Sequence, residues 1–467
     1  MNLLKNIGHL IAGSFARSII MVLFTVYIIR AMSVQDFGIY STILAFSTIT
    51  TAFVNFGLDT YLTREASKNK EVFVPLIRAV TKARFLLFVL SEVLLYSLLT
   101  ILGYSKEVIY LTLLFAFDPL LCFLLDSIYS LLYIEGRTHP VALAEFGKRA
   151  LLFLLVIFTA RVGLFWIVLS YIIADGIILA LLFLDYKRII ENYSGERNVP
   201  LSYILRKSFP FSIQTLTGLF FWNVDIMMVS KLLGPVATGL YNVGATIFKA
   251  IYFIPQAFAS VLFPKISASY HEGNIRKLRG PILESTKNLL LIAIGIVLYS
   301  QTSLPYYIPL LFGDKYSPAM KLMAPMSLIV LFYFPAFIGQ NILMAIDREN
   351  LAVNSLLFAN VSNFVLNIIL IERFGVIGAV YGTVISQVVF LGTTMYYLRD
   401  VLPDILPPLE LMGSLATGTI AWIVTALAVT WLGKYIGPEW ADNFYFVTLF
   451  LLYKTKIIKV EGFKVLD

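Results

Sequence analysis

The sequence predicts an all-α polytopic integral membrane protein with two six-helix lobes and one or two extra C-terminal helices. The first observation is composition: of 467 residues, 59% are hydrophobic and only 14% are charged. Soluble domains are about half apolar and a quarter charged. The second observation is that the apolar residues form continuous runs of about 20 or more, long enough to cross a ~30 Å hydrocarbon core. Because the runs do not alternate with polar residues, they disfavour a transmembrane β-barrel.

The third observation is a motif that occurs twice, about 200 residues apart. Residues 29–41 read IRAMSVQDFGIYS and residues 230–243 read SKLLGPVATGLYNV, each a short polar break between apolar stretches. The copies share Gly38 and Tyr40 in the first half, and Gly239 and Tyr241 in the second. We expect the glycines to allow a tight turn and the tyrosines to lie at the membrane interface with a wet hydroxyl. A motif repeated in this way predicts two homologous lobes with a transport path between them.

The apolar runs give the predicted helices in order. Those of the first lobe cover 8–32, 37–58, 76–103, 107–134, 139–160 and 163–185. Those of the second lobe cover 208–233, 236–263, 286–312, 318–345, 350–372 and 375–397, and a further helix covers 409–434. A last segment, 442–456, has an apolar core of only about ten residues and could be a short or tilted crossing or an interfacial helix.

These helices divide the chain into an N-terminal lobe at 1–186, a cytoplasmic linker at 187–207, a C-terminal lobe at 208–398, and extra helices with a basic tail at 399–467. The stretch KISASYHEGNIRKLRG at 265–280 is predicted either as a basic amphipathic surface helix or as a solvated loop.

Charge placement predicts the orientation. The net charge of +8 reflects membrane topology rather than nucleic-acid binding, because Lys and Arg lie mostly in short loops. If the N-terminus is cytoplasmic, the inside loops hold most of these residues, and the basic tail is also inside, which favours fourteen helices. One such loop carries Arg64, Lys68, Lys70, Arg78, Lys82 and Arg84. We expect a multi-pass protein of the cell membrane whose lobes start from the same side, related by a pseudo-two-fold axis along the membrane normal.

Several segments together resemble a known family over about residues 1–400. They include RAMSVQDFGIYSTILAF at 30–46, FGLDTYLTREASKNK at 56–70, FPFSIQTLTGLFFWNVDIMMVSKLLGPVATGLYNV at 209–243 and RFGVIGAVYGTVIS at 373–386. The ordered set is similar to the polysaccharide transporter family of the MOP flippase superfamily, which includes O-antigen and lipid-linked oligosaccharide flippases.

The resemblance implies a V-shaped fold with a central cavity lined by the first, second, seventh and eighth helices. It implies that a polyprenyl-(pyro)phosphate-linked sugar moves from the cytoplasmic to the outer leaflet by alternating access. The implied partners are the lipid-linked sugar, membrane lipids, and glycosyltransferases or a polymerase of the same pathway.

Charges within the predicted helices are functional candidates, because ionisable groups are costly inside a bilayer. Arg17 and Lys249 fall on two of the helices expected to line the cavity, and neither has a charged partner three or four residues away. We expect them either to hold the diphosphate of a lipid-linked substrate or to pair with acids on neighbouring helices.

The acids within helices are Glu92, Asp118, Asp126, Asp175 and Asp225. Glu92, Asp118 and Asp175 are candidates for coupling to protons or Na⁺. Asp225 lies at the position of an aspartate common in the family motif, and we expect a gating or structural pair with a cation. Glu145 precedes Lys148 and Arg149 by three and four residues, which predicts a local ion pair.

Prolines within the predicted helices mark possible bends: Pro255, Pro305, Pro309, Pro325 and Pro335. Aromatic residues near the second motif, among them Trp222 and Tyr241, are candidates to face the sugar or prenyl path.

Two other function classes remain open. A MATE-type cation-coupled multidrug exporter would share the two-lobe architecture and use the acids, although Arg17 in the first helix favours an anionic substrate. A membrane-bound polysaccharide polymerase or glycosyltransferase is disfavoured, because the outside loops are short and hold no acid–base constellation. No P-loop motif is present. The single cysteine, Cys122, and the widely spaced His9, His139 and His271 predict no disulfide, metal site or cofactor.

Overall fold

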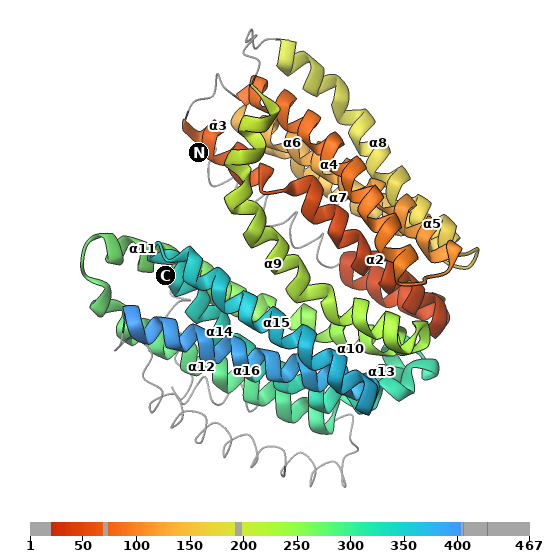
Figure 1. Cartoon of the computed structure of the whole chain (residues 1–467), viewed down its shortest axis with the longest axis vertical. Helices are drawn as coiled ribbons and strands as arrows, with labels where there is room; N and C mark the ends of the chain where they lie inside the picture. The colour runs from red at the N-terminus through yellow and green to blue at the C-terminus, as the bar shows by residue number, and fades with distance from the viewer. Residues whose placement is uncertain (1–19, 69–72, 192–198, 403–404, 406–426, 428–467) are drawn as a thin grey trace. The chain divides into compact units, whose positions relative to one another are not determined.

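The computed structural model describes residues 20–68, 73–191, 199–402, 405 and 427. Within these ranges the chain is helical throughout its regular structure (Figure 1). Arg17, the predicted helices at 409–434 and 442–456, and the basic tail lie outside the described residues, so the predicted total of helices stays a prediction. Ten of the described helical segments are long and apolar enough to span a membrane. The predicted polytopic helical membrane protein is therefore confirmed.

The chain divides into two compact units, residues 1–239 and 240–467. In the first unit, a helix at Ile20–Ala31 precedes a set of longer helices: α2 (Val34–Asn55), α3 (Leu58–Lys68), α4 (Phe73–Ile101), α5 (Lys106–Phe115), α6 (Phe117–Ile134), α7 (Thr138–Thr159), α8 (Leu164–Glu191) and α9 (Leu201–Leu233). α2 is the central helix, and it packs against α4, α5, α6 and α9.

Helix α10 (Pro235–Ile251) begins at the end of the first unit and continues into the second. The second unit then contains α11 (Phe253–His271), α12 (Arg279–Thr302), α13 (Leu304–Phe312), α14 (Met320–Ala345), α15 (Glu349–Phe374) and α16 (Val376–Val401). α14 is central here, packing against α11, α12, α15 and α16. The predicted linker at 187–207 would place α9 in the second lobe. In the structure, α9 belongs to the first compact unit. The predicted lobe boundaries stay a prediction.

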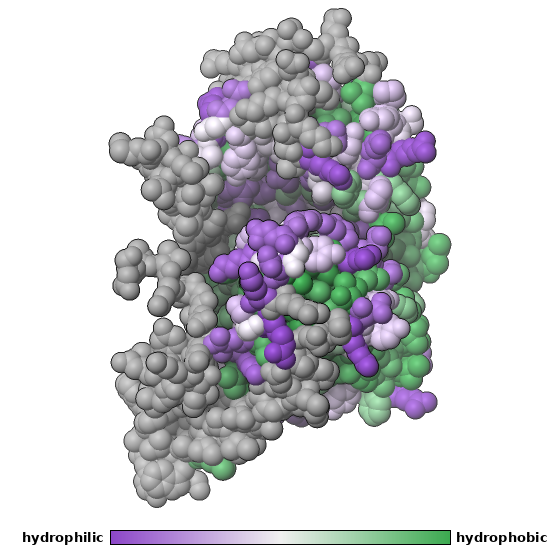
Figure 2. Space-filling view, turned by 90° about the vertical axis from the view of Figure 1, so that its left-hand side faces the viewer, coloured by the Kyte–Doolittle hydropathy of each residue, from purple (hydrophilic) through white to green (hydrophobic). Residues whose placement is uncertain are grey.

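Apolar side chains are exposed along the flanks of the helices, as expected for membrane-spanning segments. Along α4, for example, Val89, Val93 and Tyr96 are more than half exposed, while Leu95 and Leu99 on the opposite face are fully buried. Figure 2 shows hydrophilic residues gathered over one face of the molecule and hydrophobic residues beside them. Exposed apolar flanks of this length fit contact with lipid tails.

Three predicted helices are each interrupted. The predicted segments 107–134, 236–263 and 286–312 each form two helices, which meet at Ala116, Tyr252 and Ser303. In each case a proline, Pro119, Pro255 or Pro305, lies in the first turn of the second helix. Proline is tolerated there because the first backbone N–H groups of a helix have no intrahelical acceptor. Pro309, Pro325 and Pro335 instead lie inside helices that continue past them.

The stretch 265–280, predicted as a surface helix or as a solvated loop, forms neither one separate helix nor one continuous loop. α11 runs on to His271, a 3₁₀ turn covers Ile275–Leu278, and α12 begins at Arg279. Most of this stretch therefore extends the two flanking helices. The exposed His271 imidazole lies 3.6 Å from the Asp347 carboxylate at the end of α14.

Candidate functional site

The two copies of the repeated motif pack against each other. A Cβ atom on Gly38 in α2 would lie 1.7 Å from the backbone oxygen of Pro235, and one on Gly239 in α10 would lie 2.3 Å from that of Val34. Each glycine thus accommodates the backbone of the other copy. The expectation that these glycines serve tight turns is wrong, because both lie inside helices and are needed for the close approach of two backbones.

Hydrogen bonds join the same region. The hydroxyls of Thr42 on α2 and Ser230 on α9 lie 2.7 Å apart, and Tyr104 donates its phenolic hydrogen to Ser230 Oγ at 3.1 Å. Lys231 Nζ donates to the backbone oxygen of Leu102 in the turn after α4. The end of α9 is therefore held to α2 and to the α4–α5 connection by polar contacts within the first unit.

The motif tyrosines are buried rather than at a wet interface, which corrects the prediction. Tyr40 is 4% exposed and Tyr241 is 3% exposed. The Tyr40 hydroxyl lies 2.5 Å from that of Tyr171 on α8, and the Tyr241 hydroxyl lies 3.3 Å from Thr383 Oγ1 on α16. Both motif tyrosines thus connect their own helix to another helix of the same unit.

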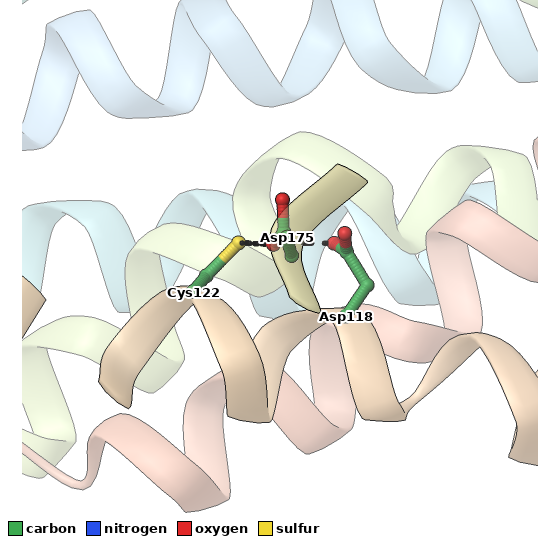
Figure 3. A group of neighbouring side chains, drawn as sticks. All are labelled: Asp118, Cys122 and Asp175. Atoms are coloured by element: carbon green, nitrogen blue, oxygen red, sulfur yellow. Dashed lines mark hydrogen bonds between the residues drawn. The ribbon is translucent and has the colours of Figure 1, made fainter. Parts of the chain in front are cut away.

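A buried ionisable cluster lies between α6, α7 and α8. Figure 3 shows three of its side chains, Asp118 and Cys122 of α6 and Asp175 of α8. Lys148 Nζ is 2.9 Å from the Asp175 carboxylate and 3.0 Å from Cys122 Sγ. The Cys122 thiol donates to Asp175 at 3.0 Å, and it lies 3.9 Å from Asp118 on its own helix. The side chains of Lys148 and Asp175 are 8% and 1% exposed. We call Asp118, Cys122, Lys148 and Asp175 the N-terminal polar cluster.

The structure brings together two of the predicted coupling residues, Asp118 and Asp175, and adds Lys148. From sequence spacing we predicted a local ion pair between Lys148 and Glu145, and we did not predict this pair between two helices. Asp118, Cys122 and Asp175 also each offer a ligand atom within 4.8 Å of the others. The adjacent ammonium group supplies the positive charge that a cation would otherwise bring, so these contacts fit a structural polar network better than a metal centre.

A second buried pair lies in the first unit. Arg84 on α4 is fully buried, and its guanidinium donates to the Asp59 carboxylate on α3, to Ser127 Oγ and to the Phe123 backbone oxygen of α6. The Phe123 ring also faces it, 5.3 Å from the guanidinium carbon. Arg84 therefore joins three helices, and its assignment to a cytoplasmic loop was wrong.

In the second unit, amides connect α15 and α16. Asn367 Nδ2 donates to Asn363 Oδ1 at 2.9 Å, one helical turn apart, and Asn363 Nδ2 donates to Ser386 Oγ at 3.4 Å. All three side chains are buried. Sequence reasoning missed this network, although two asparagines four residues apart on an apolar helix were a usable signal.

The other predicted residues that the structure describes lie on α4, α9, α10 and α11. Asp225 is buried on α9, and the Trp222 ring lies edge-to-face with Phe221 at 5.4 Å. Lys249 lies in the last turn of α10, just before the break at Tyr252, and not in the middle of one continuous helix. Pro255 is buried at the start of α11. Glu92 lies on α4, with Thr50 of α2 beside its carboxyl group.

The described geometry has counterparts among known proteins. Residues 3–270, more than half of the chain's 467 residues, match the family described as polysaccharide biosynthesis protein. The chain belongs to this polysaccharide biosynthesis protein family. Residues 210–370 also match the MatE family. The matches support a flippase-like transporter of the MOP superfamily and indicate a transporter rather than an enzyme.

Two archaeal relatives are similar to this family member. An uncharacterised membrane protein of Methanocaldococcus jannaschii is 21% identical over 390 residues, covering 79% of this chain and 91% of that protein. A probable low-salt glycan biosynthesis flippase of Haloferax volcanii is 24% identical over 193 residues, 40% of each chain.

Solved structures show the same fold. The lipid II flippase MurJ in an inward closed conformation has a TM-score of 0.73 at 15% identity, covering 97% of this chain and 100% of that chain. An inward-facing MATE family multidrug transporter of the MOP superfamily has a TM-score of 0.65 at 15% identity, covering 83% of this chain and 95% of that chain. These likenesses confirm the predicted fold class of this polysaccharide biosynthesis family member.

Proposed function

We propose that this protein is a flippase that moves a polyprenyl-(pyro)phosphate-linked oligosaccharide from the cytoplasmic to the outer leaflet by alternating access. The observation that carries the proposal is the family match over residues 3–270. The similarity to a probable glycan biosynthesis flippase supports the same substrate class. The protein would act in the cell membrane with its N-terminus in the cytoplasm, beside glycosyltransferases or a polymerase that make and use the lipid-linked sugar.

Arg17 and Lys249 are the proposed contacts for the substrate diphosphate. A guanidinium group can donate two parallel hydrogen bonds to phosphate oxygens, and an ammonium group adds a point charge. Lys249 precedes a helix break, where backbone groups are released from regular pairing and a polar ligand can be accommodated. Asp225, Trp222, Tyr241 and Pro255 are proposed to line or gate the path.

The membrane potential is the proposed driving force for an anionic substrate. A potential that is negative inside favours outward movement of negative charge by about 2.3 kcal/mol per charge per 100 mV. Proteoliposomes with a clamped potential and no ion gradient should therefore flip a fluorescent polyprenyl-diphosphate sugar. Flipping that appears only with an ion gradient would overturn the potential as the driver, and no flipping under either condition would overturn the flippase function.

A multidrug exporter is the second candidate, favoured by the match to the MatE family at 210–370 and by the shared fold. The same proteoliposomes distinguish the two functions. Cation-driven export of an organic cation, with no flipping of the lipid-linked sugar, would establish the exporter. The reverse result would establish the flippase.

A further inference from the structure

Thr50 differs from the other hydroxyl-bearing residues of α2 in its hydrogen bonding. Ser41, Thr42, Ser47, Thr48 and Thr51 each donate to a backbone oxygen three or four residues earlier in the helix. Thr50 differs: its Oγ1 is buried with no such partner, and the residue is 0% exposed. A buried hydroxyl that makes no hydrogen bond costs free energy, so another group is expected to use it.

That group is Glu92 on α4. The Thr50 hydroxyl lies beside its carboxyl group, and Glu92 Oε1, like Thr50 Oγ1, is buried and makes no hydrogen bond in the structure. Glu92 lies nine residues before the end of the apolar span Pro75–Ile101, about 14 Å along the helix at 1.5 Å per residue. The carboxyl and the hydroxyl therefore lie side by side within the membrane-spanning part of the first unit.

The surroundings of this pair are apolar. The residues packed around this stretch include Phe46 and Ile49 of α2, Phe88 and Leu95 of α4, and Leu120 of α6. From α9, Met227 packs against the same cluster. Among the residues that the structure describes, no charged side chain pairs with Glu92. On the same helix, the Arg84 guanidinium pairs with the Asp59 carboxylate of α3.

Glu92 therefore differs from the acids of the N-terminal polar cluster. The Asp175 carboxylate has the Lys148 ammonium as a partner 2.9 Å away. An ionised Glu92 would lack such a counter-charge, and an uncompensated charge inside a bilayer is expensive.

We propose that Glu92 and Thr50 form a proton-binding site, in which the neutral Glu92 carboxyl hydrogen-bonds to the Thr50 hydroxyl. Glu92 lies beside the lipid-facing flank of α4, next to Val89, Val93 and Tyr96, all of which are exposed. The site is thus reachable from the hydrocarbon, and a proton can be exchanged when the α2–α4 contact admits water. We also infer that Glu92 exchanges this proton during transport, and this inference rests on the proposed function.

The test uses N,N′-dicyclohexylcarbodiimide, an apolar reagent that reacts with protonated carboxyls. The carboxyl proton goes to a carbodiimide nitrogen, the carboxyl oxygen adds to the central carbon, and no group leaves. The full-length protein in lipid vesicles is treated across a pH series, and modified peptides are identified by mass spectrometry. We expect the adduct on Glu92, with labelling that falls as pH rises, and little on Asp175.

Variants locate the site. Glu92→Gln should lose the adduct. Thr50→Val should shift the pH profile of Glu92 labelling, whereas the matched control Thr51→Val should leave it unchanged, because the Thr51 hydroxyl donates to the Ser47 backbone oxygen instead. Labelling of Asp118 or Asp175 in place of Glu92, or an unlabelled Glu92 at every pH in the folded wild-type protein, would overturn the proposal.

A separate assay addresses coupling. In proteoliposomes, Glu92→Gln should abolish the response of flipping to a pH gradient while the response to the membrane potential remains. An unchanged response in this variant would overturn coupling through Glu92. Absence of flipping in the wild-type protein would contradict the proposed function, and the labelling result would still decide whether the proton site exists.

Discussion

Lys148 can pair with an acid on its own helix or with one on a neighbour. Glu145 lies one turn earlier on α7, yet the Lys148 ammonium lies 2.9 Å from Asp175 on α8. Local spacing identified the charged residues but not this partner, because a buried charge is stabilised most by a partner that is also removed from water. Such pairing depends on which helix faces bring the groups together.

The pair makes a prediction about stability. Lys148→Met alone, or Asp175→Asn alone, removes one partner and leaves the other ionisable group buried, which should cost about 3–5 kcal/mol. Thermal unfolding in detergent should show a lower Tm for each single variant and a partial recovery in Lys148→Met/Asp175→Leu. Arg161→Gln, at an exposed position between α7 and α8, is the control and should leave Tm unchanged. Equal Tm values for all four proteins would contradict a structural ion pair.

At the scale of the elements, the repeated glycines and the prolines act through backbone geometry. Gly38 and Gly239 let α2 and the start of α10 approach until a Cβ atom would meet backbone oxygen. Pro119, Pro255 and Pro305 lie where three long apolar segments restart as new helices. Hydropathy did not predict these breaks, because both sides of each break are apolar and the interruption removes only a few backbone hydrogen bonds.

The glycine contact makes a second prediction. Gly38→Ala or Gly239→Ala places a methyl group against backbone oxygen rather than a movable side chain, so each should destabilise the protein by about 1–3 kcal/mol through overpacking. The matched control is Gly218→Ala within α9, where a Cβ atom meets nothing within 4 Å. That control should be neutral or stabilising by up to about 1 kcal/mol, because alanine favours helix. Thermal unfolding of the three variants measures the difference, and similar Tm values would contradict the close contact.

At the scale of the whole molecule, the chain forms two compact units that each surround one central helix. α2 has this place in the first unit and α14 in the second. The buried polar networks also lie within units, with ion pairs in the first and with Asn363, Asn367 and Ser386 in the second. Because polar contacts inside a membrane hold helices together, each unit is expected to keep its internal packing while substrate is moved.

Transport provides the prediction at this scale. Arg17→Ala and Lys249→Ala should each lower flipping of a polyprenyl-diphosphate sugar at least tenfold, because one lost charge-assisted contact to phosphate is worth about 1.5–3 kcal/mol. Membrane insertion and the Tm of the purified protein should stay near the wild-type values. Arg161→Ala serves as the control for a lost surface charge. Wild-type flipping by the double variant Arg17→Ala/Lys249→Ala would contradict their role.

Much of the architecture was predictable because it depends on composition and on segment length. A bilayer requires about 20 apolar residues per crossing, so hydropathy alone located most spans, and the two motif copies indicated a repeat. The ordered motifs also indicated the family that the comparison over residues 3–270 confirms. The number of helices, the lobe boundaries and the substrate residues stay predictions.

Contacts between helices could be decided only by the tertiary structure. In the sequence, Asp118, Asp175 and Glu92 are equivalent acids in apolar helices, and Gly38 and Gly239 are equivalent to turn glycines. Packing gives Asp175 a lysine, leaves Glu92 beside a threonine in apolar surroundings, and sets the two glycines against backbone. The physical reason is that apolar side chains direct a helix into the bilayer whichever neighbours it has, whereas the role of a buried polar group depends on the atoms within hydrogen-bonding distance.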